Sequence, residues 1–346
     1  MNNILVTGGS GYIGSHTLIS LIENGFNPIV VDNLSNSSLE ALKRVETICK
    51  TTIPFHQGDI RDQVFLDEVF CQNKIKAVIH FAGLKSVGES NQKPLEYYDN
   101  NVNGTNVLLH SMRAAKIYNF IFSSSATVYG DPSSTPITED FPLSATNPYG
   151  RSKLIVEDIC RELTKPDACE ENGPFKIALL RYFNPVGAHQ SGTIGEDPKG
   201  IPNNLLPYIS QVAIGKRKKL SIYGNDYATV DGTGVRDYIH VMDLARGHVN
   251  TLEWLLKQDN NEAICRSFNL GTGTGYSVLE ILRSFEKVSK TPIPFQVAAR
   301  RNGDIAKCFA SVDRAKNELQ WTAKKSLDDM MSDTWKWQKN NPEGYQ

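Results

Sequence analysis

Tyr149 and Lys153, in the segment Tyr149-Gly150-Arg151-Ser152-Lys153, are the residues whose types and spacing are best suited to chemistry. On a helix, side chains four positions apart share one face and lie one turn apart. A free phenol titrates near pH ~10 and is a poor base at neutrality, but a nearby ammonium or another positive charge lowers its pKa. The pair therefore predicts a general base that takes a proton from a hydroxyl group as hydride leaves.

A serine-rich segment, Ser123-Ser124-Ser125-Ala126-Thr127, follows an expected strand and ends in the same cleft. The hydroxyl of Ser125 is suited to hold the substrate oxygen in line with the base. Alone, a Tyr-x-x-x-Lys pattern is common, and an exposed pair on a helix is the simpler interpretation. The catalytic interpretation therefore depends on a cofactor signature elsewhere in the chain.

That signature is the segment Thr7-Gly8-Gly9-Ser10-Gly11-Tyr12-Ile13-Gly14, which lies between the first expected strand and the first expected helix. In that context, glycines permit a tight turn and let the backbone approach a pyrophosphate, whose charge sits against the helix N-terminus. Flexible loops also collect glycine, so the position between strand and helix is what predicts a dinucleotide site.

Asp32 ends the second expected strand, roughly 20 residues beyond the glycines, where a carboxylate accepts hydrogen bonds from an adenosine ribose. Its charge would repel a 2′-phosphate, and the following segment Asn33–Ser38 contains no arginine or lysine to offset that repulsion. The sequence therefore favours NAD over NADP. An aspartate that only orders a turn is the alternative.

Two later strand ends fit the same cleft. Asp59, which precedes Ile60, is expected to accept a hydrogen bond from the adenine amino group. The segment His80-Phe81-Ala82-Gly83-Leu84-Lys85 ends the fourth strand, and ligands bind beyond the carboxyl ends of parallel strands. Lys85 is expected to reach ribose hydroxyls or phosphate, with a solvated surface lysine as the alternative.

The elements that must position these residues alternate between short apolar runs and longer amphipathic ones. Strands are expected at residues 3–7, 28–32, 53–57, 77–82, 119–124 and 176–182, and helices include 14–25 and 104–115. Near-continuous apolar strands separated by helices predict an α/β fold with a doubly wound parallel (Rossmann) sheet covered on both faces.

After residue 183, proline- and glycine-rich segments break this alternation and predict a smaller, loop-rich α/β substrate lobe. Strand and helix return near 238–252 and 268–271, so the lobes are expected to interleave. The cofactor domain is assigned residues 1–183 and about 237–265, and the substrate domain about 184–236 and 266–346. The last residues, from 340, are expected to fray.

The composition excludes several classes of protein. With 37 basic and 38 acidic residues, no global charge favours nucleic acid or an anionic membrane. No signal peptide is recognisable, and no apolar run approaches the roughly 18 residues of a membrane span. Six cysteines without a Cys-x-x-Cys pair predict neither a metal site nor disulfides, but reduced thiols in the cytoplasm.

From the glycine segment at 7–14 to residues 334–338, the sequence resembles the extended short-chain dehydrogenase/reductases, and within them the UDP-glucose 4-epimerases. The resemblance is carried by residues 81–90, 94–104, 122–130, 180–189, 195–207 and 223–243. It implies that Tyr149 is the base, that Lys153 binds the nicotinamide ribose and that Ser125 orients the substrate. It also implies a homodimer formed through helices around 102–115 and 151–163.

The cofactor implied is a tightly bound NAD. The residues expected to bind it are Gly8, Gly11, Tyr12, Ile13, Gly14, Asp32, Asn33, Leu34, Ser35, Asn36, Asp59, Ile60, Phe81, Ala82, Gly83, Lys85, Asn100, Ser123, Tyr149, Lys153, Tyr182 and Phe183.

The substrate implied is a UDP-sugar. The residues expected to contact it are Ser125, Ala126, Thr127, Tyr149, Asn184, Asn203, Asn204, Leu205, Ser221, Ile222, Tyr223, Arg236, Arg301, Asp304 and Cys308. Two arginines suit a diphosphate, and an aspartate suits the uridine ribose; surface ion pairs are the alternative. The family usually has glutamate where Asn302 stands, and a residue that contributes only its backbone tolerates that difference.

Cys308 occupies a position where some relatives carry tyrosine, which closes the sugar pocket. The smaller cysteine implies room for an N-acetyl group, and so activity on UDP-N-acetylglucosamine and UDP-N-acetylgalactosamine as well. A buried cysteine that acts only as a small apolar side chain is the alternative.

The reaction implied is reversible 4-epimerisation of UDP-galactose and UDP-glucose through a 4-keto sugar. Two other classes of protein are the alternatives. A nucleotide-sugar dehydratase typically has Asp-Glu after the fifth strand, where this chain has Ala126 and Thr127, and a decarboxylating relative also needs a glutamate there. A non-catalytic NAD-sensing protein need not retain base, lysine and serine together.

Overall fold

The computed structural model describes residues 2–259, 261–301 and 303–345. Its centre is a seven-stranded sheet in the order β10-β6-β5-β4-β1-β2-β3, in which every neighbouring pair is parallel. The strands are β1 (Asn3–Thr7), β2 (Asn27–Asp32), β3 (Phe55–Gln57), β4 (Ile75–His80), β5 (Asn119–Ser125), β6 (Lys176–Tyr182) and β10 (Ile264–Leu270). The prediction of a Rossmann sheet is confirmed.

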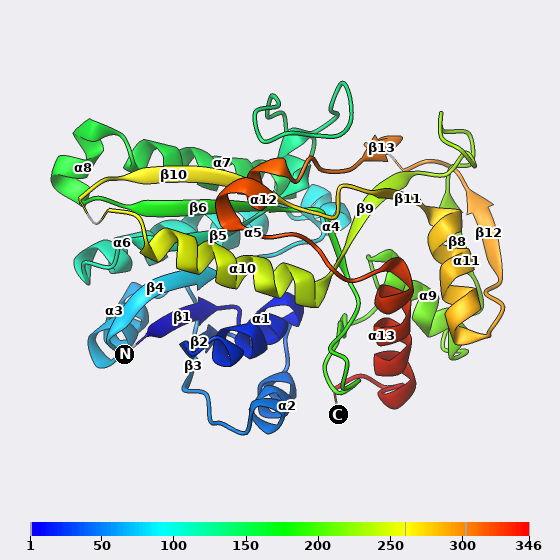
Figure 1. The fold of residues 1–346 in the computed structure, drawn as a ribbon, viewed down its shortest axis with the longest axis horizontal. Helices are drawn as coiled ribbons and strands as arrows, with labels where there is room; N and C mark the ends of the chain where they lie inside the picture. The colour runs from blue at the N-terminus through cyan, green and yellow to red at the C-terminus, as the bar shows by residue number, and fades with distance from the viewer. Residues whose placement is uncertain (1, 260, 302, 346) are drawn as a thin grey trace.

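Helices cover both faces of this sheet because its strands are apolar on both sides. Ile4 and Val6 of β1 pack with one group of helices, and Leu5 between them packs with the other. The first group is α1 (Tyr12–Glu23), α2 (Leu39–Cys49), α10 (Val241–Leu256) and α12 (Asp313–Leu319). The second includes α3 (Gln63–Gln72), α6 (Gly104–Ala114) and α7 (Pro148–Leu163). Figure 1 shows α1 and α10 side by side on one face.

Short helices complete this lobe. They are α4 (Val87–Gln92), α5 (Pro94–Tyr98), the π-helical turn η1 (Asp99–Asn103), the 3₁₀ turn η2 (Ala126–Tyr129) and α8 (Pro166–Asn172). Within the described residues, no helix combines the length and apolar character needed to cross a membrane.

A smaller set of elements gathers at one end of the molecule (Figure 1). A four-stranded sheet is formed by β7 (Asn184–Val186), β9 (Val235–His240), β11 (Gly275–Ser277) and β13 (Lys307–Cys308). A two-stranded sheet is formed by β8 (Leu220–Tyr223) and β12 (Phe295–Ala298). Three helices, α9 (Leu205–Ala213), α11 (Val278–Ser289) and α13 (Leu327–Asn340), pack with these strands around an apolar core of their own.

The expected strand at 77–82 ends earlier, at His80. The N–H groups of Phe81 and Ala82 both donate to the Thr7 carbonyl, at 2.9 and 3.1 Å, so the chain crosses the end of β1 instead of continuing the strand. The strands at 3–7 and 176–182 have the expected bounds.

The large sheet extends past residue 265, where the expected cofactor segment ended. All seven residues of β10 pair with β6, so residues 266–270 belong to the sheet. Conversely β9, whose last residues fell in that segment, pairs with β7, β11 and β13 of the smaller lobe. Side-chain apolarity predicted both strands, whereas the sheet each one joins depends on contacts far along the chain.

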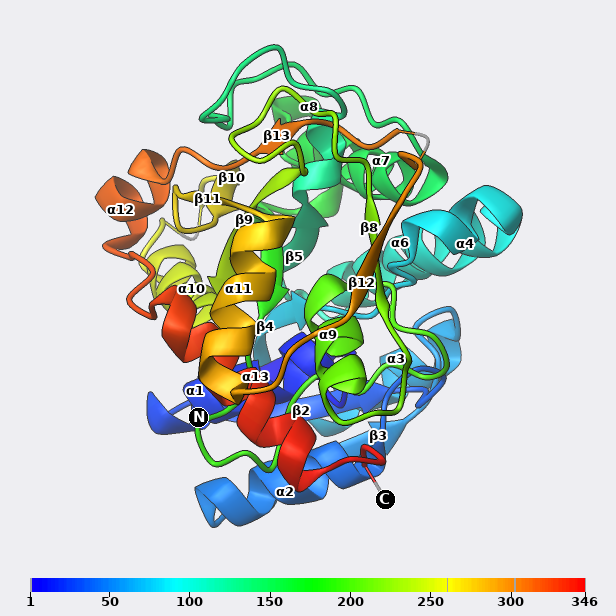
Figure 2. The same ribbon diagram turned by 90° about the vertical axis from the view of Figure 1, so that its right-hand side faces the viewer.

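The expectation of a frayed C-terminus is wrong for the described residues. The hydroxyl of Tyr345 lies 3.1 Å from both the N–H and the carbonyl of Gly195. Its ring packs against Trp337, and the Arg44 guanidinium lies over it, 5.2 Å from the ring centre. Figure 2 shows the chain leaving α13 toward α2. The short polar tail gives no periodic signal, so only the folded chain reveals its partners.

Candidate active site

The turn between β1 and α1 has the shape of a phosphate cradle. Gly8 has φ +71°, and a Cβ there would lie 2.6 Å from the backbone nitrogen of Ala82. A Cβ on Gly14 would lie 2.4 Å from the Gly8 carbonyl oxygen. The N-cap of α1 is Gly11, which offers no side-chain cap to the first N–H groups of the helix. Such free N–H groups favour an anion, so the turn fits a pyrophosphate.

Asp32 is buried and organises the loop that follows β2. Its carboxylate accepts from the Ser10 N–H at 3.0 Å, the Leu34 N–H at 2.9 Å and the Ser37 hydroxyl at 2.8 Å. Leu34 has φ +57°, which this bonding supports. Asp32 therefore orders a turn in the structure, as the alternative interpretation of this residue expected. A carboxylate has about four lone-pair sites, so capacity for a ribose hydroxyl remains.

Asp59 forms an ion pair with Arg61, a residue that the sequence analysis did not include in the site. Arg61 pairs with it at 2.8 Å, and Asn33 donates to it at 3.0 Å. Hydrogen bonds from Arg61 hold the pKa of Asp59 well below its usual range. Ile60 is buried in the core beneath α6, so only its backbone remains for a ligand.

The segment after β4 lies where β1 and β4 end together, since Thr7 pairs with His80. The Phe81 ring packs on His248, with ring centres 4.8 Å apart. Lys85 forms an ion pair with Glu196 at 3.1 Å, from a loop of the other lobe. The Lys85 side chain is exposed, as the solvated-lysine alternative expects, and the ion pair is a surface one.

Tyr149 and Lys153 lie on α7 as predicted, one turn apart. The Ser125 side chain lies close enough to the Tyr149 phenol to lower its pKa, so the expected orienting group and the expected base are neighbours. Burial raises the pKa of Tyr149, and the influence of Ser125 offsets that rise only in part.

Lys153 does not supply the expected ammonium contact to the phenol. Its Nζ donates to the Ser123 carbonyl at 2.7 Å and lies 4.7 Å from the centre of the Phe122 ring. Burial lowers the pKa of this lysine to about 7. The expected contribution of the Lys153 ammonium to the acidity of Tyr149 is therefore absent from the protein groups alone, because desolvation opposes charge on both groups.

Tyr182 ends β6, and Phe183 follows it directly, at the same edge of the sheet as Ser125. The Tyr182 hydroxyl bonds to His248 and to Ser123, and burial raises its pKa well above the usual value. Phe183 is buried with Leu154 and Ala310. Asn100 donates to Asn101, which the sequence interpretation missed although it is almost wholly buried.

Asn101 links the loop after β4 to the catalytic helix. Its amide accepts from the Leu84 N–H at 2.7 Å and donates to the Leu84 carbonyl at 2.9 Å and the Ser152 hydroxyl at 3.0 Å. It lies in the π-helical turn η1, and such irregular turns are frequent at functional sites. A π-turn has no period that marks it in a sequence.

The expected substrate residues fall on the smaller lobe and its borders. Asn184 begins β7, and Leu205 begins α9 directly after Asn204. Asn204 donates to Glu196 at 2.7 Å, and Asn203 to Ser86 at 3.2 Å. Ala126 and Thr127 form the turn η2, whose N-cap Ser125 accepts from the Thr127 N–H at 3.2 Å.

A second group of expected substrate residues lies along β8, β9 and the segment before β13. The Arg301 guanidinium lies 4.8 Å from the centre of the exposed Tyr223 ring and pairs with Asp304 at 2.8 Å. Arg236 donates to the carbonyl of Val235. Ser221 accepts from Gln296, and Ile222 is buried in the small core. Asn302 lies outside the described residues.

Cys308 pairs with Arg236 in the register of β13 and β9. It packs at the edge of the apolar cluster that contains Phe183, and burial raises the pKa of its thiol to about 11. It is therefore an unreactive small side chain, positioned between the expected diphosphate-binding arginine and the expected cofactor contact.

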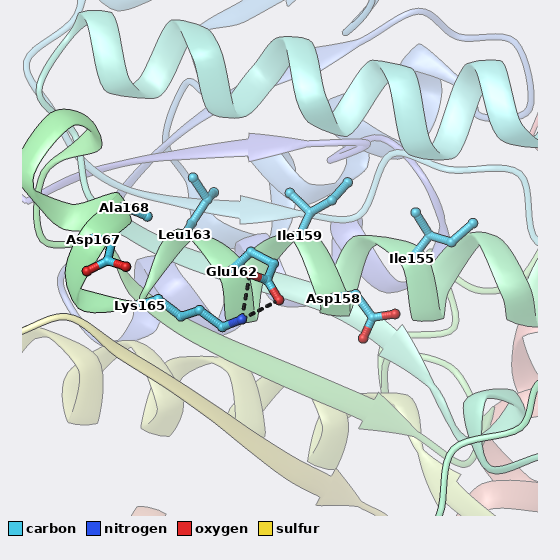
Figure 3. A pocket seen from close by; sticks show the side chains of 8 residues that line it. All are labelled: Ile155, Asp158, Ile159, Glu162, Leu163, Lys165, Asp167 and Ala168. Carbon is cyan, nitrogen blue, oxygen red and sulfur yellow. Dashed lines mark hydrogen bonds and ion pairs between the residues drawn. The ribbon is translucent and has the colours of Figure 1, made fainter.

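A hollow among the described residues lies away from this site. It measures about 630 Å³ and lies on the outer side of α7 and α8. Figure 3 shows Ile155, Ile159 and Leu163 projecting from one side of α7, with Glu162 bonded to Lys165 beside them. This surface lies within the helix segment expected to form a dimer.

A doubly wound sheet, a glycine cradle and the group of Ser125, Tyr149 and buried Lys153 near the ends of the strands define an extended short-chain dehydrogenase/reductase. A family model described as GDP-mannose 4,6 dehydratase matches residues 5–334. UDP-glucose 4-epimerase from Dictyostelium discoideum is 58% identical over 344 residues, covering 99% of this chain and 98% of the relative.

Solved structures agree with the sequence relatives. UDP-glucose 4-epimerase from Bifidobacterium longum, in complex with NAD+ and UDP, is 51% identical with a TM-score of 0.93 and covers 99% of each chain. The UDP-Glc/GlcNAc 4-epimerase from Campylobacter jejuni is 36% identical with a TM-score of 0.83, covering 98% of this chain and all of that one. The chain belongs to the UDP-glucose 4-epimerase family.

Proposed function

We propose that the protein is an NAD-dependent isomerase that interconverts UDP-galactose and UDP-glucose by inverting the hydroxyl at C4. The observation that carries this proposal is the placement of Tyr149 and Lys153 one turn apart on α7, with Ser125 near the phenol, in a fold whose first turn is a glycine cradle. Bound NAD supplies the hydride acceptor and donor.

The chain's own groups position the sugar and move one proton. Tyr149 takes the O4 proton as C4 loses hydride, and returns it when hydride comes back to the opposite face. Ser125 holds O4 in line with the phenol. Lys153 keeps its ammonium near the nicotinamide ribose. Between the two transfers the 4-keto sugar turns over while its UDP stays anchored on the smaller lobe.

We assign NAD binding to the larger lobe and UDP binding to the smaller one. The cradle of Gly8, Gly11 and Gly14 fits the pyrophosphate, and Asp32 fits the adenosine ribose. On the other lobe, Arg236 and Arg301 suit the diphosphate, and Asp304 suits the uridine ribose. The Arg301–Asp304 pair must open or reorient to make those contacts.

The first experiment is incubation of purified protein with UDP-galactose and no added NAD. Appearance of UDP-glucose, with one equivalent of NAD released on denaturation, supports both the reaction and the tightly held cofactor. A dehydratase would form a 4-keto-6-deoxy sugar instead. An NAD-sensing protein would give neither product nor a change in the absorbance of the reduced nicotinamide.

We further propose that the acetylated UDP-sugars are substrates, because Cys308, which packs against the cluster of Phe183, is smaller than the tyrosine that some relatives carry at this position. Turnover of UDP-N-acetylglucosamine and UDP-N-acetylgalactosamine tests this proposal. Absence of detectable product, with normal turnover of UDP-galactose, refutes it.

A homodimer is proposed through the outer faces of α6 and α7. The exposed edge of α7 carries three apolar residues, Ile155, Ile159 and Leu163, that line the hollow of about 630 Å³. A second copy of the chain would bury them. Light scattering on the eluted protein measures the mass directly. The cytoplasm is the proposed compartment, because all six cysteines are free thiols.

A further inference from the structure

A buried carboxylate on α7 lies one turn beyond Lys153 and takes no part in the mechanism above. Glu157 is fully buried, and it follows Tyr149 and Lys153 at the same four-residue spacing on one face of the helix. A buried carboxylate is costly unless it is paired and hydrogen-bonded. Its partners therefore indicate what it stabilises.

Besides Arg161 on α7 itself, those partners come from the two strands that end beneath the catalytic site. The Ser124 hydroxyl of β5 donates to Glu157 Oε1 at 2.6 Å. Arg181 of β6 donates to both carboxylate oxygens, through Nε at 3.0 Å and through Nη2 at 2.7 Å. Ser124 and Arg181 are themselves register partners in the sheet. The carboxylate is thus held by a bidentate pair and by a neighbouring hydroxyl.

The three serines at the end of β5 each contact one residue on this face of α7. Ser125 lies close enough to Tyr149 to lower its pKa, the carbonyl of Ser123 accepts from Lys153, and Ser124 donates to Glu157. Any slide of the helix along the strand end would disturb all three contacts together.

Arg181 is anchored on its other side as well. Its Nη1 donates to the Tyr129 hydroxyl and to the Glu139 carbonyl, each at 2.9 Å. Tyr129 in turn donates to Asn269 of β10 at 2.7 Å. Arg181 is among the largest fully buried side chains of the protein. The clamp on α7 is therefore connected to three strands of the sheet.

We propose that Glu157 is a positioning residue, clamped by Ser124 and Arg181, that fixes where α7 lies along the ends of the strands. This sets the distance from Tyr149 to the reacting oxygen. It rests on the proposed function, since positioning matters only if Tyr149 is the base. Displacements of about 1 Å at a reacting group cost up to about 10²-fold in rate.

The test compares Ser124→Ala and Glu157→Gln with Asp243→Asn in NAD-loaded enzyme. Asp243 is a matched control because it is a buried, hydrogen-bonded carboxylate on α10, outside the site. Both site variants are expected to lose about tenfold or more in kcat with KM for UDP-galactose within about twofold. Asp243→Asn is expected to lower the melting temperature and leave kcat unchanged.

A double variant that lacks both buried charges distinguishes a loss of positioning from a loss of stability. In Glu157→Leu/Arg181→Met both buried charges are removed, and apolar replacements of this kind often restore stability. We expect its melting temperature to recover relative to Glu157→Gln while kcat stays low. Recovery of kcat together with stability, or wild-type kcat in Ser124→Ala, overturns the proposal. Absence of wild-type epimerase activity would instead refute the proposed function.

Discussion

At the scale of single residues, the site is governed by desolvation. Burial raises the pKa of Tyr149 and lowers that of Lys153 to about 7, so in the protein alone desolvation opposes charge on both groups. A neutral phenol is a weak base, and the missing positive charge is the one that an oxidised nicotinamide carries. The base is thus expected to be active only when the cofactor is oxidised, which couples proton transfer to hydride transfer.

Tyr149→Phe removes only the hydroxyl that accepts the proton. We expect kcat for UDP-galactose to fall by about 10²–10⁴-fold, the range of a general base, while bound NAD and the melting temperature stay near wild-type values. Tyr118→Phe is the control, because Tyr118 precedes β5 at the opposite end of the strand from Ser125. Comparable kcat in both variants would exclude Tyr149 as the base.

Cys308→Tyr tests the sugar pocket. The larger side chain is expected to lower kcat/KM for the acetylated UDP-sugars by about tenfold or more and to leave UDP-galactose turnover nearly unchanged, since steric exclusion acts on the added group. Cys308→Ala is expected to keep both activities. Both rates are measured by chromatography of the products. Equal losses on both sugar classes would indicate general damage to the pocket.

At the scale of elements, a loop between β7 and α9 ties the two lobes together across the proposed cofactor cleft. Lys199 donates to the carbonyls of Leu34 and Ser35, and Glu196 pairs with Lys85. Tyr345 of the tail binds the same loop at Gly195. The loop is thus held from the cofactor lobe on one side and from the C-terminus on the other.

Tyr345→Ala should loosen this loop. We expect a loss of about 2 kcal/mol in the free energy of unfolding, as for other packed positions, and faster release of NAD. Tyr345→Phe keeps the ring stacked on Trp337 and beneath Arg44, and is expected to lose less than half as much. Urea unfolding and the NAD content after gel filtration measure the two effects. Full NAD retention in the alanine variant would contradict the role of the tail.

At the scale of the whole molecule, stability depends on buried neutral histidines. Burial lowers the pKa of His16 and His80 from 6.5 to about 3, and that of His248 to about 4. Between those values and 6.5, the unfolded chain binds protons that the folded chain does not. The free energy of unfolding therefore falls as pH drops below 6.5.

Each such histidine contributes a slope of up to about 1.4 kcal/mol per pH unit, so the three together give up to about 4. Urea unfolding at several values between pH 7.5 and 5 measures this slope. His16→Gln is expected to reduce it by about a third, because one titrating group is lost. An unchanged slope in that variant would show that His16 is not buried in its neutral form.

What the sequence determined by itself is the part of the protein that depends on local pattern. Apolar runs predicted the parallel sheet because a strand buried on both faces must be apolar throughout. The glycine turn and the Tyr149–Lys153 spacing were readable because a turn and a helix face involve neighbouring residues.

Only the tertiary structure determined which residues far apart in the chain form ion pairs, hydrogen bonds or packing contacts with each other. Arg61 forms an ion pair with Asp59, and Lys153 donates a hydrogen bond to Ser123. The C-terminal tail binds through Tyr345 to a loop 150 positions earlier in the chain. The clamp on Glu157 joins a helix to residues of two strands. Such contacts leave no periodic trace in a sequence, because pairing between distant residues is set by packing and by the need to satisfy buried polar groups.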